Sequence, residues 1–272
     1  MNDRVDAIVR RLAESRKYSG LARSTLERIA IDAVRRHTKD ADAEKAAKRR
    51  LHQVFGAYRA HDAAALARRV RELPSVDDRE RFEAACRELL RMHASTAERI
   101  ADVDAFYRDV FAFTGSPHVV LDLACGHQPF QWPWMGLAPD AMYLPRDLDG
   151  ALIDAIDTFL EHVGRPRTAR VQDVLVDAPD EPADVAFLLK VLPCLERQER
   201  GGALRVLRAV RARFVVVSFP IESLGGRDKG MRAQYSETMA RWAAELAVEP
   251  VRIDCPTELV YVWRSRSESL RE

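Results

Sequence analysis

The sequence predicts an α/β protein in which an all-helical N-terminal half precedes an open, mostly parallel sheet. Up to about residue 112, apolar residues recur only at helical spacing. After Thr114-Gly115-Ser116-Pro117, short apolar runs alternate with amphipathic stretches of helix length, as in βαβ units. The last two runs are separated only by Pro256-Thr257-Glu258, which is too short for a helical crossover. We therefore expect two domains, 1–112 and 113–272, the second ending in an antiparallel hairpin.

The first half carries apolar residues on single helical faces. Val5, Ile8, Val9 and Leu12 form the first such face, and similar faces recur within 51–58 and 82–90. Ser24 and Glu27 have the spacing of a capping box at the start of a helix. We expect a single bundle of five or six helices.

Seven apolar runs in the second half are the predicted strands. They span 118–123, 141–145, 168–171, 185–189, 214–219, 251–255 and 259–263. Amphipathic segments such as 152–160 and 204–210 lie between them. Five parallel strands followed by an antiparallel hairpin are the outline of a Rossmann-like, class I methyltransferase sheet.

The composition excludes several classes of protein. Apolar residues make up 47% of the chain, enough for a sizeable core. No apolar run approaches the ~20 residues that cross a bilayer, and the first residues lack a secretion signal. The four cysteines are scattered, without Cys-x-x-Cys spacing. We expect a cytoplasmic protein without membrane, metal or disulfide.

The formal net charge of +1 conceals an asymmetry between the halves. Residues 1–60 carry 15 basic and 8 acidic side chains, whereas residues 111–272 carry 19 basic and 23 acidic ones. A basic segment beside a mildly acidic one fits a nucleic-acid-docking module next to a small-molecule domain. A solvated helical surface is the competing interpretation.

The first predicted strand runs into Asp122-x-Ala124-x-Gly126. Pyrophosphate cofactors require G-x-G-x-x-G, because backbone amides must approach the phosphates closely, so NAD chemistry is disfavoured. S-adenosylmethionine has no phosphate and needs only small residues here. A plain strand-to-helix turn remains the alternative for this motif alone.

The next two strand ends favour the cofactor. Asp147 lies 21 residues after Gly126, where a carboxylate can accept hydrogen bonds from both ribose hydroxyls. Asp149 suits the cap of the following helix, which leaves Asp147 free. Asp173 could accept from the adenine amino group, with Val174 packing on the ring. Three strand ends thus predict an S-adenosylmethionine methyltransferase domain.

Two further segments could approach a substrate. Lys190 ends the fourth strand, where it could position a target or simply extend into solvent from the strand end. A glycine-rich loop after the fifth strand carries Arg227, Lys229 and Arg232, and it could contact a phosphate backbone or be an ordinary surface loop.

Longer motifs are spread from about residue 5 to residue 263. They are Ser15-Arg16-Lys17-Tyr18, Lys48-Arg49-Arg50-Leu51-His52, Gly56-Ala57-Tyr58, His93-Ala94-Ser95-Thr96-Ala97-Glu98-Arg99, Leu123-Ala124-Cys125-Gly126, Pro133-Trp134-Met135-Gly136-Leu137, Leu188-Leu189-Lys190, Leu192-Pro193-Cys194-Leu195-Glu196, Gln198, Ser223-Leu224-Gly225 and Lys229-Gly230-Met231. Together they resemble one family, the aminoglycoside-resistance 16S rRNA methyltransferases that modify N7 of the guanine at position 1405. The chain departs from the family at Gln128-Pro129, where Asn-Pro is more frequent.

The resemblance implies a set of S-adenosylmethionine contacts and a role in drug resistance. The implied contacts are Phe55, His93, Ala94, Ser95, Arg99, Ala124, Gly126, Asp147, Asp173, Val174, Leu189 and Gln198. Arg99 suits the methionine carboxylate because a guanidinium can bind it through two hydrogen bonds. Ser95 and Glu98 also have capping-box spacing, so part of this segment could merely begin a helix.

Guanine N7 carries a free lone pair, so we expect no general base and no catalytic residue, only positioning of the target. A flipped base would need a stacking partner, for which Trp132, Trp134, Phe219 and Tyr235 are candidates that equally suit a core.

The residues expected to bind rRNA are Arg16, Lys17, Lys48, Arg49, Arg50, Arg227 and Lys229. We expect a monomer acting on the 30S subunit.

Two alternatives remain open at this point. The chain could methylate a small molecule, with the helical half acting as a lid. It could also be a non-catalytic RNA-binding protein on the same fold.

Overall fold

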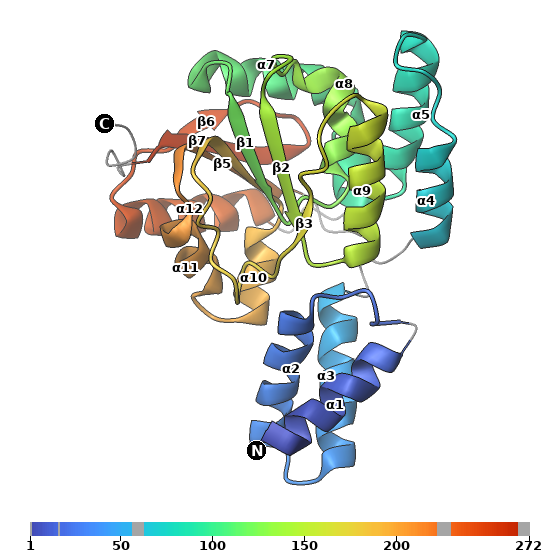
Figure 1. Ribbon diagram of the computed structural model, residues 1–272. Helices are drawn as coiled ribbons and strands as arrows, with labels where there is room; N and C mark the ends of the chain where they lie inside the picture. Colours follow the sequence, from blue (N-terminus) through green and yellow to red (C-terminus); the bar gives the residue numbers. More distant parts are fainter. Residues whose placement is uncertain (1, 16, 56–62, 222–229, 266–272) are drawn as a thin grey trace.

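A single sheet organises the molecule, with strand order β3-β2-β1-β4-β5-β7-β6 (Figure 1). The structure is a computed structural model that describes residues 2–15, 17–55, 63–221 and 230–265. The strands are β1 (Val119–Leu123), β2 (Met142–Asp147), β3 (Arg170–Val171), β4 (Ala183–Leu189), β5 (Ala212–Pro220), β6 (Val251–Ile253) and β7 (Glu258–Arg264). Each of the seven predicted runs forms a strand.

The first five strands are parallel, and the predicted antiparallel hairpin is confirmed at one edge. β7 lies between β5 and β6 and is antiparallel to both. β3 is the shortest strand, because it is exposed at the opposite edge and has little apolar surface to bury. The chain reverses its winding direction at β1, which lies between β2 and β4. In such sheets a ligand binds beyond the carboxyl ends of these central strands.

Three helices form a separate bundle below the sheet in Figure 1. They are α1 (Asn2–Glu14), α2 (Arg23–Arg36) and α3 (Asp40–Phe55). Their own core includes Ile8, Leu12, Leu26 and Leu51, all 2% exposed or less. The apolar face predicted from Val5 to Leu12 is confirmed, because all four of its residues are buried in this core.

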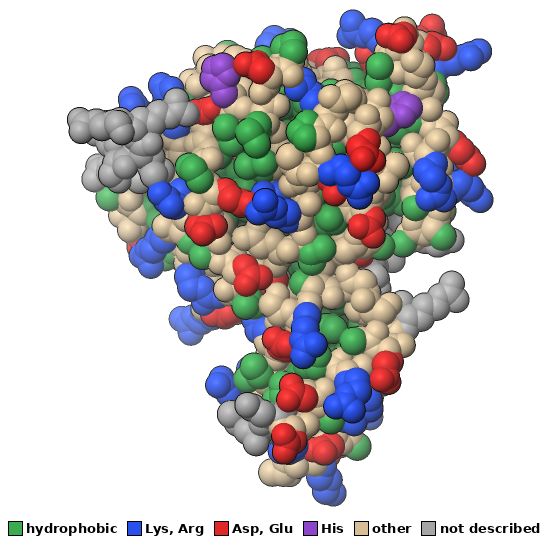
Figure 2. All heavy atoms as spheres, in the orientation of Figure 1, with side chains coloured by type: hydrophobic (Ala, Val, Ile, Leu, Met, Phe, Trp, Pro, Cys, Tyr) green, Lys and Arg blue, Asp and Glu red, His purple; other side chains and the backbone are tan. Residues whose placement is uncertain are grey.

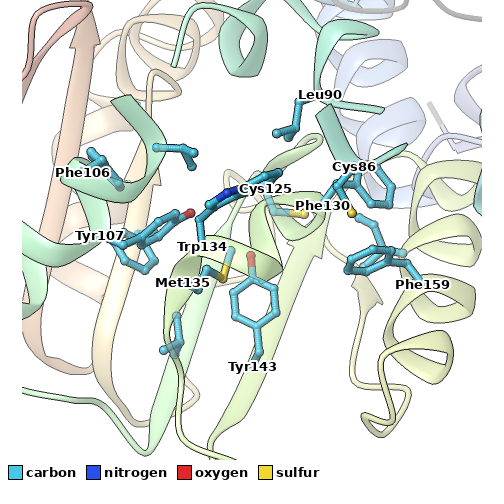
Figure 3. Close-up of a cluster of buried hydrophobic side chains, with 14 of the residues drawn as sticks. Cys86, Leu90, Phe106, Tyr107, Cys125, Phe130, Trp134, Met135, Tyr143 and Phe159 are labelled. Atoms are coloured by element: carbon cyan, nitrogen blue, oxygen red, sulfur yellow. The ribbon is translucent and has the colours of Figure 1, made fainter. Parts of the chain in front are cut away.

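The expectation of one N-terminal bundle is wrong, because the helices from α4 onward join the core of the sheet. They are α4 (Ala63–Arg71), α5 (Arg79–Arg91), α6 (Ala94–Ala97), the 3₁₀ helix η1 (Ile100–Asp102) and α7 (Val103–Thr114). Phe82 and Cys86 of α5 share a cluster with Phe130 and with Phe159 of α9 (Gly150–His162). Figure 3 shows the side chains of Cys86, Phe130 and Phe159 close together. The change from helix to strand near residue 114 is therefore not where the hydrophobic core divides.

The remaining helices complete the layers around the sheet. They are the 3₁₀ helix η2 (Gln128–Gln131), α8 (Trp132–Met135), α10 (Leu192–Gln198), α11 (Gly202–Ala209) and α12 (Met231–Leu246). Helices α10 to α12 pack with the inner residues of β4, β5 and β7 in a second core. No described helix has the length and apolar character needed to cross a membrane.

The capping box predicted at Ser24 and Glu27 is wrong. The helix begins one residue earlier, at Arg23, and Ala22 is its cap without a side-chain hydrogen bond. The Ser24 hydroxyl instead donates to Asp177 Oδ2 at 3.3 Å, across the boundary between the bundle and the sheet. The hydroxyl that the local pattern predicted to cap the helix thus forms a tertiary hydrogen bond instead.

The bundle meets the body of the protein at the carboxyl end of β2. Gly150 N–H donates to Gly20 O at 2.7 Å and Ala22 N–H donates to Leu148 O at 2.8 Å, while Leu21 pairs with Asp149 in an isolated β-bridge. These backbone contacts fix the bundle directly beside Asp147, at the edge of the sheet where a ligand is expected.

Candidate functional site

A cavity of about 720 Å³ lies at the carboxyl ends of the parallel strands. Small-molecule sites typically enclose roughly 300–1,000 Å³. The cavity wall includes the predicted contacts His93, Ser95, Arg99, Ala124, Gly126, Asp147, Asp173, Val174, Leu189 and Gln198. Lys17, Leu21 and His52 of the N-terminal bundle complete one side. Two predicted contacts fall outside this set: Ala94 is exposed on α6, and the Phe55 side chain lies outside the described residues.

The turn after β1 is shaped by backbone conformation. Ala124 and Gly126 both have φ +53°. A Cβ added at Gly126 would meet the His93 ring no closer than 3.7 Å, so the left-handed backbone, and not crowding, favours glycine here. Ala124 adopts the same conformation despite its Cβ, at a cost of about 1–2 kcal/mol.

Asp147 closes this turn with its carboxylate. Oδ2 accepts from Gly126 N–H at 3.0 Å, and Oδ1 accepts from Asp149 N–H at 3.1 Å. Burial raises the pKa of Asp147 to about 6, although these amide bonds oppose the shift. Because the Gly126 amide donates to a carboxylate, it cannot serve a phosphate. The cap role predicted for Asp149 is confirmed, since its Oδ1 accepts from Ala151 N–H at 3.1 Å.

Asp173 and Gln198 lie at another part of the cavity wall, and both are bound by the N-terminal bundle. Asp173 Oδ2 accepts from Thr25 Oγ1 at 2.8 Å and from Arg28 Nη2 at 3.0 Å. The same Arg28 nitrogen donates to Gln198 Oε1 at 2.9 Å. Asp173 Oδ1 accepts from Leu175 N–H at 3.0 Å. Asp173, predicted to bind adenine, and Gln198, a cofactor contact implied by the family resemblance, both line the cavity, and Arg28 of α2 bonds both side chains.

Arg99 is 1% exposed, and its forked side chain is already paired. Nε and Nη2 bind the two Glu258 oxygens at 2.5 and 2.8 Å, and Nη1 donates to Gln131 Oε1 at 3.3 Å. The Glu258 charge holds the pKa of Arg99 above its ordinary value, against the effect of burial. The two-pronged contact predicted for a methionine carboxylate is therefore made with Glu258. The hydrogen bond from Nη1 to Gln131 is the longest of the three, so Nη1 is the nitrogen of Arg99 best placed to bind a ligand instead.

Lys190 follows β4 with φ +57°, a strained conformation for a lysine. Its Nζ donates to Ser95 O at 3.0 Å and to Glu98 Oε2 at 2.6 Å. The expected solvent-exposed alternative is wrong, because the residue is 8% exposed and lines the cavity. The capping alternative for Ser95 and Glu98 is also wrong, since His93 caps α6 and Glu98 binds Lys190.

The residues expected to bind rRNA differ in exposure and in the groups that they already contact. Lys17 lines the cavity mouth with its Nζ 3.2 Å from His52 Nδ1, and Lys48 pairs with Glu44 in the same helix. Arg49 is exposed, whereas Arg50 donates to Gln198 O at 2.6 Å. Arg16, Arg227 and Lys229 lie outside the described residues. On the face in Figure 2, Lys and Arg alternate with Asp and Glu over the bundle.

The four aromatic candidates for base stacking pack into or against the cores. Phe219 and Trp134 are 0% and 6% exposed, and Tyr235 stacks on Phe219 with ring centroids 5.1 Å apart. Trp132 packs against Tyr143 and Arg165. None of the four lines the described cavity wall, so the core alternative fits them better.

Several wall residues carried no prediction. His127 and Gln128 line the cavity from the turn after β1, and Thr25 and Arg28 support it from α2. Thr25 could have been noticed, because it is a polar residue on the apolar face that includes Leu26 and Ile29. Within the described ranges, no cluster of three or more His, Cys, Asp or Glu could hold a metal ion.

The cavity fits a phosphate-free nucleoside cofactor. Its turn offers a carboxylate and not a phosphate cradle, and Asp147 can accept from ribose hydroxyls. Asp173 and Gln198 supply polar groups, and Val174 and Leu189 supply apolar contact for a base. S-adenosylmethionine combines these parts with an amino acid end that would lie toward Arg99.

Comparison with known proteins agrees with this chemistry. Residues 14–262 match the family model described as ribosomal RNA methyltransferase (FmrO). The chain is 38% identical to a 16S rRNA (guanine(1405)-N(7))-methyltransferase of Micromonospora echinospora, over 96% of each chain. A protein of the same description from Micromonospora rosea is 37% identical over 96% of this chain and 97% of its own. The crystal structure of 16S rRNA methyltransferase RmtF with S-adenosyl-L-homocysteine superimposes with a TM-score of 0.80 at 33% identity, covering 97% of this chain and all of that one.

Proposed function

The chain belongs to the ribosomal RNA methyltransferase (FmrO) family, and on that premise we propose that it methylates N7 of guanine 1405 in 16S rRNA. It is an enzyme that uses S-adenosylmethionine as the methyl donor. Methylation at this nucleotide would remove hydrogen bonds and add charge where aminoglycosides bind, and so confer resistance. The observation that carries the proposal is the Asp147 carboxylate bonded to the Gly126 amide, in a cavity suited to a nucleoside without phosphate.

We propose a division of labour among the cavity residues. Asp147 accepts from the ribose, while Ala124 and Gly126 let the cofactor pass close to the backbone. Asp173, Val174, Leu189 and Gln198 hold the adenine. His93, Ser95 and the Nη1 edge of Arg99 lie nearer the amino acid end, and the family pattern adds Phe55. Ala94 is left out of this assignment, because it is exposed and outside the cavity wall.

The reaction requires alignment more than proton transfer. When bound, S-adenosylmethionine supplies an electrophilic methyl group on a sulfonium. Guanine N7 has a free lone pair, so no side chain has to remove a proton, and we assign no catalytic base. Lys190 positions the target at the cavity wall. Its ammonium is neutralised by Glu98 at 2.6 Å, which lessens repulsion as the purine becomes positively charged.

We propose that residues 1–112 dock on rRNA, chiefly through the α1–α3 bundle, and that residues 113–272 form the methyltransferase sheet. His93, Ser95 and Arg99 reach the cofactor cavity from the segment before the sheet. The 15 basic side chains among residues 1–60 support this division, with Arg16, Lys17, Lys48 and Arg49 as phosphate contacts and Arg227 and Lys229 assisting. Arg50 would contribute mainly by seating the bundle, because its guanidinium binds Gln198 O. We further propose that the enzyme is a monomer, uses no metal, and acts on the 30S subunit in the cytoplasm.

The decisive experiment incubates 30S subunits with the protein and S-adenosylmethionine carrying a labelled methyl group, then maps the modified nucleotide. Label at N7 of guanine 1405 supports the proposal, and label elsewhere or none would refute it. Free 16S rRNA serves as the comparison substrate for the role of the assembled particle.

Salt dependence distinguishes rRNA docking from a lid over a small-molecule site. Binding to rRNA should weaken steeply with salt, with a slope of roughly 0.9 per phosphate contact on a double-logarithmic plot for duplex sites. Replacing Arg49 by Ala should reduce this slope by about one. A lid would give little salt dependence, and a non-catalytic RNA-binding protein would bind rRNA without binding S-adenosylmethionine.

A further inference from the structure

Arg28 connects the N-terminal bundle to the adenine end of the cavity. It extends from α2, and its Nη2 lies 3.0 Å from Asp173 Oδ2 and 2.9 Å from Gln198 Oε1. The Arg28 side chain is 21% exposed and that of Asp173 only 3% exposed. Thr25, almost one helical turn earlier, donates to the same carboxylate oxygen. A single guanidinium therefore binds two side chains of the cavity wall, one in the loop after β3 and one at the end of α10.

The donor character of arginine has a consequence for Gln198. A guanidinium carries only donors, so it can bind the amide oxygen of Gln198 but not the nitrogen. With Oε1 taken, the Gln198 Nε2 is the group left for another partner, and that group is a donor. The Asp173 carboxylate, in contrast, offers acceptors only. Adenine presents an amino donor beside a ring-nitrogen acceptor, so this pairing of acceptor and donor is complementary to it.

We propose that Arg28 is a positioning residue for cofactor recognition: by holding Asp173 Oδ2 and Gln198 Oε1, it orients both side chains toward adenine. The N-terminal bundle then has a second role besides docking on rRNA. The Arg28 contacts that attach the bundle to the sheet domain are the same contacts on which the affinity for the cofactor depends. By thermodynamic linkage, the bound cofactor stabilises the attachment of the bundle by the same free energy with which the attached bundle stabilises cofactor binding. This inference rests on the proposed function, since it takes adenine as the ligand.

The test is calorimetric titration of S-adenosylhomocysteine into the full-length protein and its variants. Arg28→Ala should weaken binding at least tenfold, about 1.4 kcal/mol. Arg28→Lys should recover part of the loss, because an ammonium retains charge but lacks the planar fork. The matched control is Arg36→Ala, which removes an exposed arginine of the same helix paired with Asp32, and should bind within twofold of wild type. In methylation assays Arg28→Ala should raise KM for S-adenosylmethionine and leave kcat within twofold.

A second variant separates orientation from simple structural support. Gln198→Glu keeps an acceptor for Arg28 but removes the amide donor, so it should weaken S-adenosylhomocysteine binding without lowering the melting temperature of the unliganded protein. Arg28→Ala added to Gln198→Ala should cost less than in the wild-type background, because both changes remove one shared contact. If Arg28→Ala does not fold, Arg28→Lys and Gln198→Glu carry the same test.

Two results would overturn the inference: wild-type affinity in Arg28→Ala, whatever its melting temperature, or fully additive losses in the double variant. These outcomes are distinct from failure of the proposed function. If the wild-type protein itself does not bind S-adenosylhomocysteine, the proposed function fails. If the wild type binds and the Arg28 variants bind equally well, only the role of Arg28 is lost.

Discussion

The protonation of Asp147 should control cofactor affinity between pH 5 and pH 8. Its two oxygens accept from the Gly126 and Asp149 amides at 3.0 and 3.1 Å, and the ionised form has further lone pairs for two ribose hydroxyls. Burial raises the pKa of this carboxyl to about 6. Protonation turns an acceptor into a donor, so affinity should fall as pH drops through 6. With that pKa, the ionised fraction predicts a dissociation constant about elevenfold higher at pH 5 than at pH 8.

The assay is calorimetric titration of S-adenosylhomocysteine at half-unit pH steps, with circular dichroism at each pH to verify folding. Asp147→Asn is the matched variant, because it keeps the size of the side chain but cannot be charged. It should bind about tenfold to a hundredfold more weakly at pH 8, since hydrogen bonds to charged groups contribute about 1.5–3 kcal/mol each. Its pH profile should be flatter than that of wild type. Equal wild-type affinity at pH 5 and 8 would refute the reasoning, and an unchanged profile in Asp147→Asn would show that a group other than Asp147 causes the dependence.

Three further outcomes follow from buried charges. Glu258→Gln should lower the free energy of unfolding by about 3–5 kcal/mol in urea titrations, because Arg99 stays buried without its counter-charge; a loss below about 1 kcal/mol would contradict this, given the usual worth of surface pairs. Burial raises the pKa of Asp122 to about 7, so the folded state holds a proton that the unfolded state releases, and stability should fall by about 3 kcal/mol as pH rises from 4 to 7. Asp122→Asn should remove that component, and a parallel pH profile in the variant would disprove it. Lys190→Met should reduce methyl transfer to 30S subunits at least tenfold while S-adenosylhomocysteine affinity stays within threefold; unaltered transfer would exclude a role for Lys190 in positioning the target.

Local sequence patterns were sufficient to predict those features that depend only on residues within one short segment. The seven strands follow from short apolar runs, and the terminal hairpin follows from a connection too short to hold a helix. The capping role of Asp149 likewise depends only on its neighbour Ala151. Six of the proposed cofactor contacts line one cavity because the carboxyl ends of parallel strands converge at the same edge: Ala124, Gly126, Asp147, Asp173, Val174 and Leu189. Four others, implied by the family resemblance, reach the same cavity from helical segments: His93, Ser95, Arg99 and Gln198.

Contacts between distant segments could not be derived in this way. Helical periodicity indicates that a helix has an apolar face but not what covers it, so the division between the α1–α3 bundle and the helices packed on the sheet was missed. The Ser24 hydroxyl bonds Asp177 and not its own helix, because a residue 153 positions away lies within reach.

The sequence by itself determined the strands and their terminal hairpin, the phosphate-free turn at Gly126 and the carboxylate at Asp147, since these depend on residue type and short-range spacing. Only the tertiary structure decided which charges meet. Arg99 finds Glu258 at a separation of 159 residues, and Arg28 finds Asp173 at 145. A buried ion needs an oppositely charged partner, but the sequence contains many such residues and does not indicate which one will lie beside it. The packing of the helices and strands decides which buried charges pair.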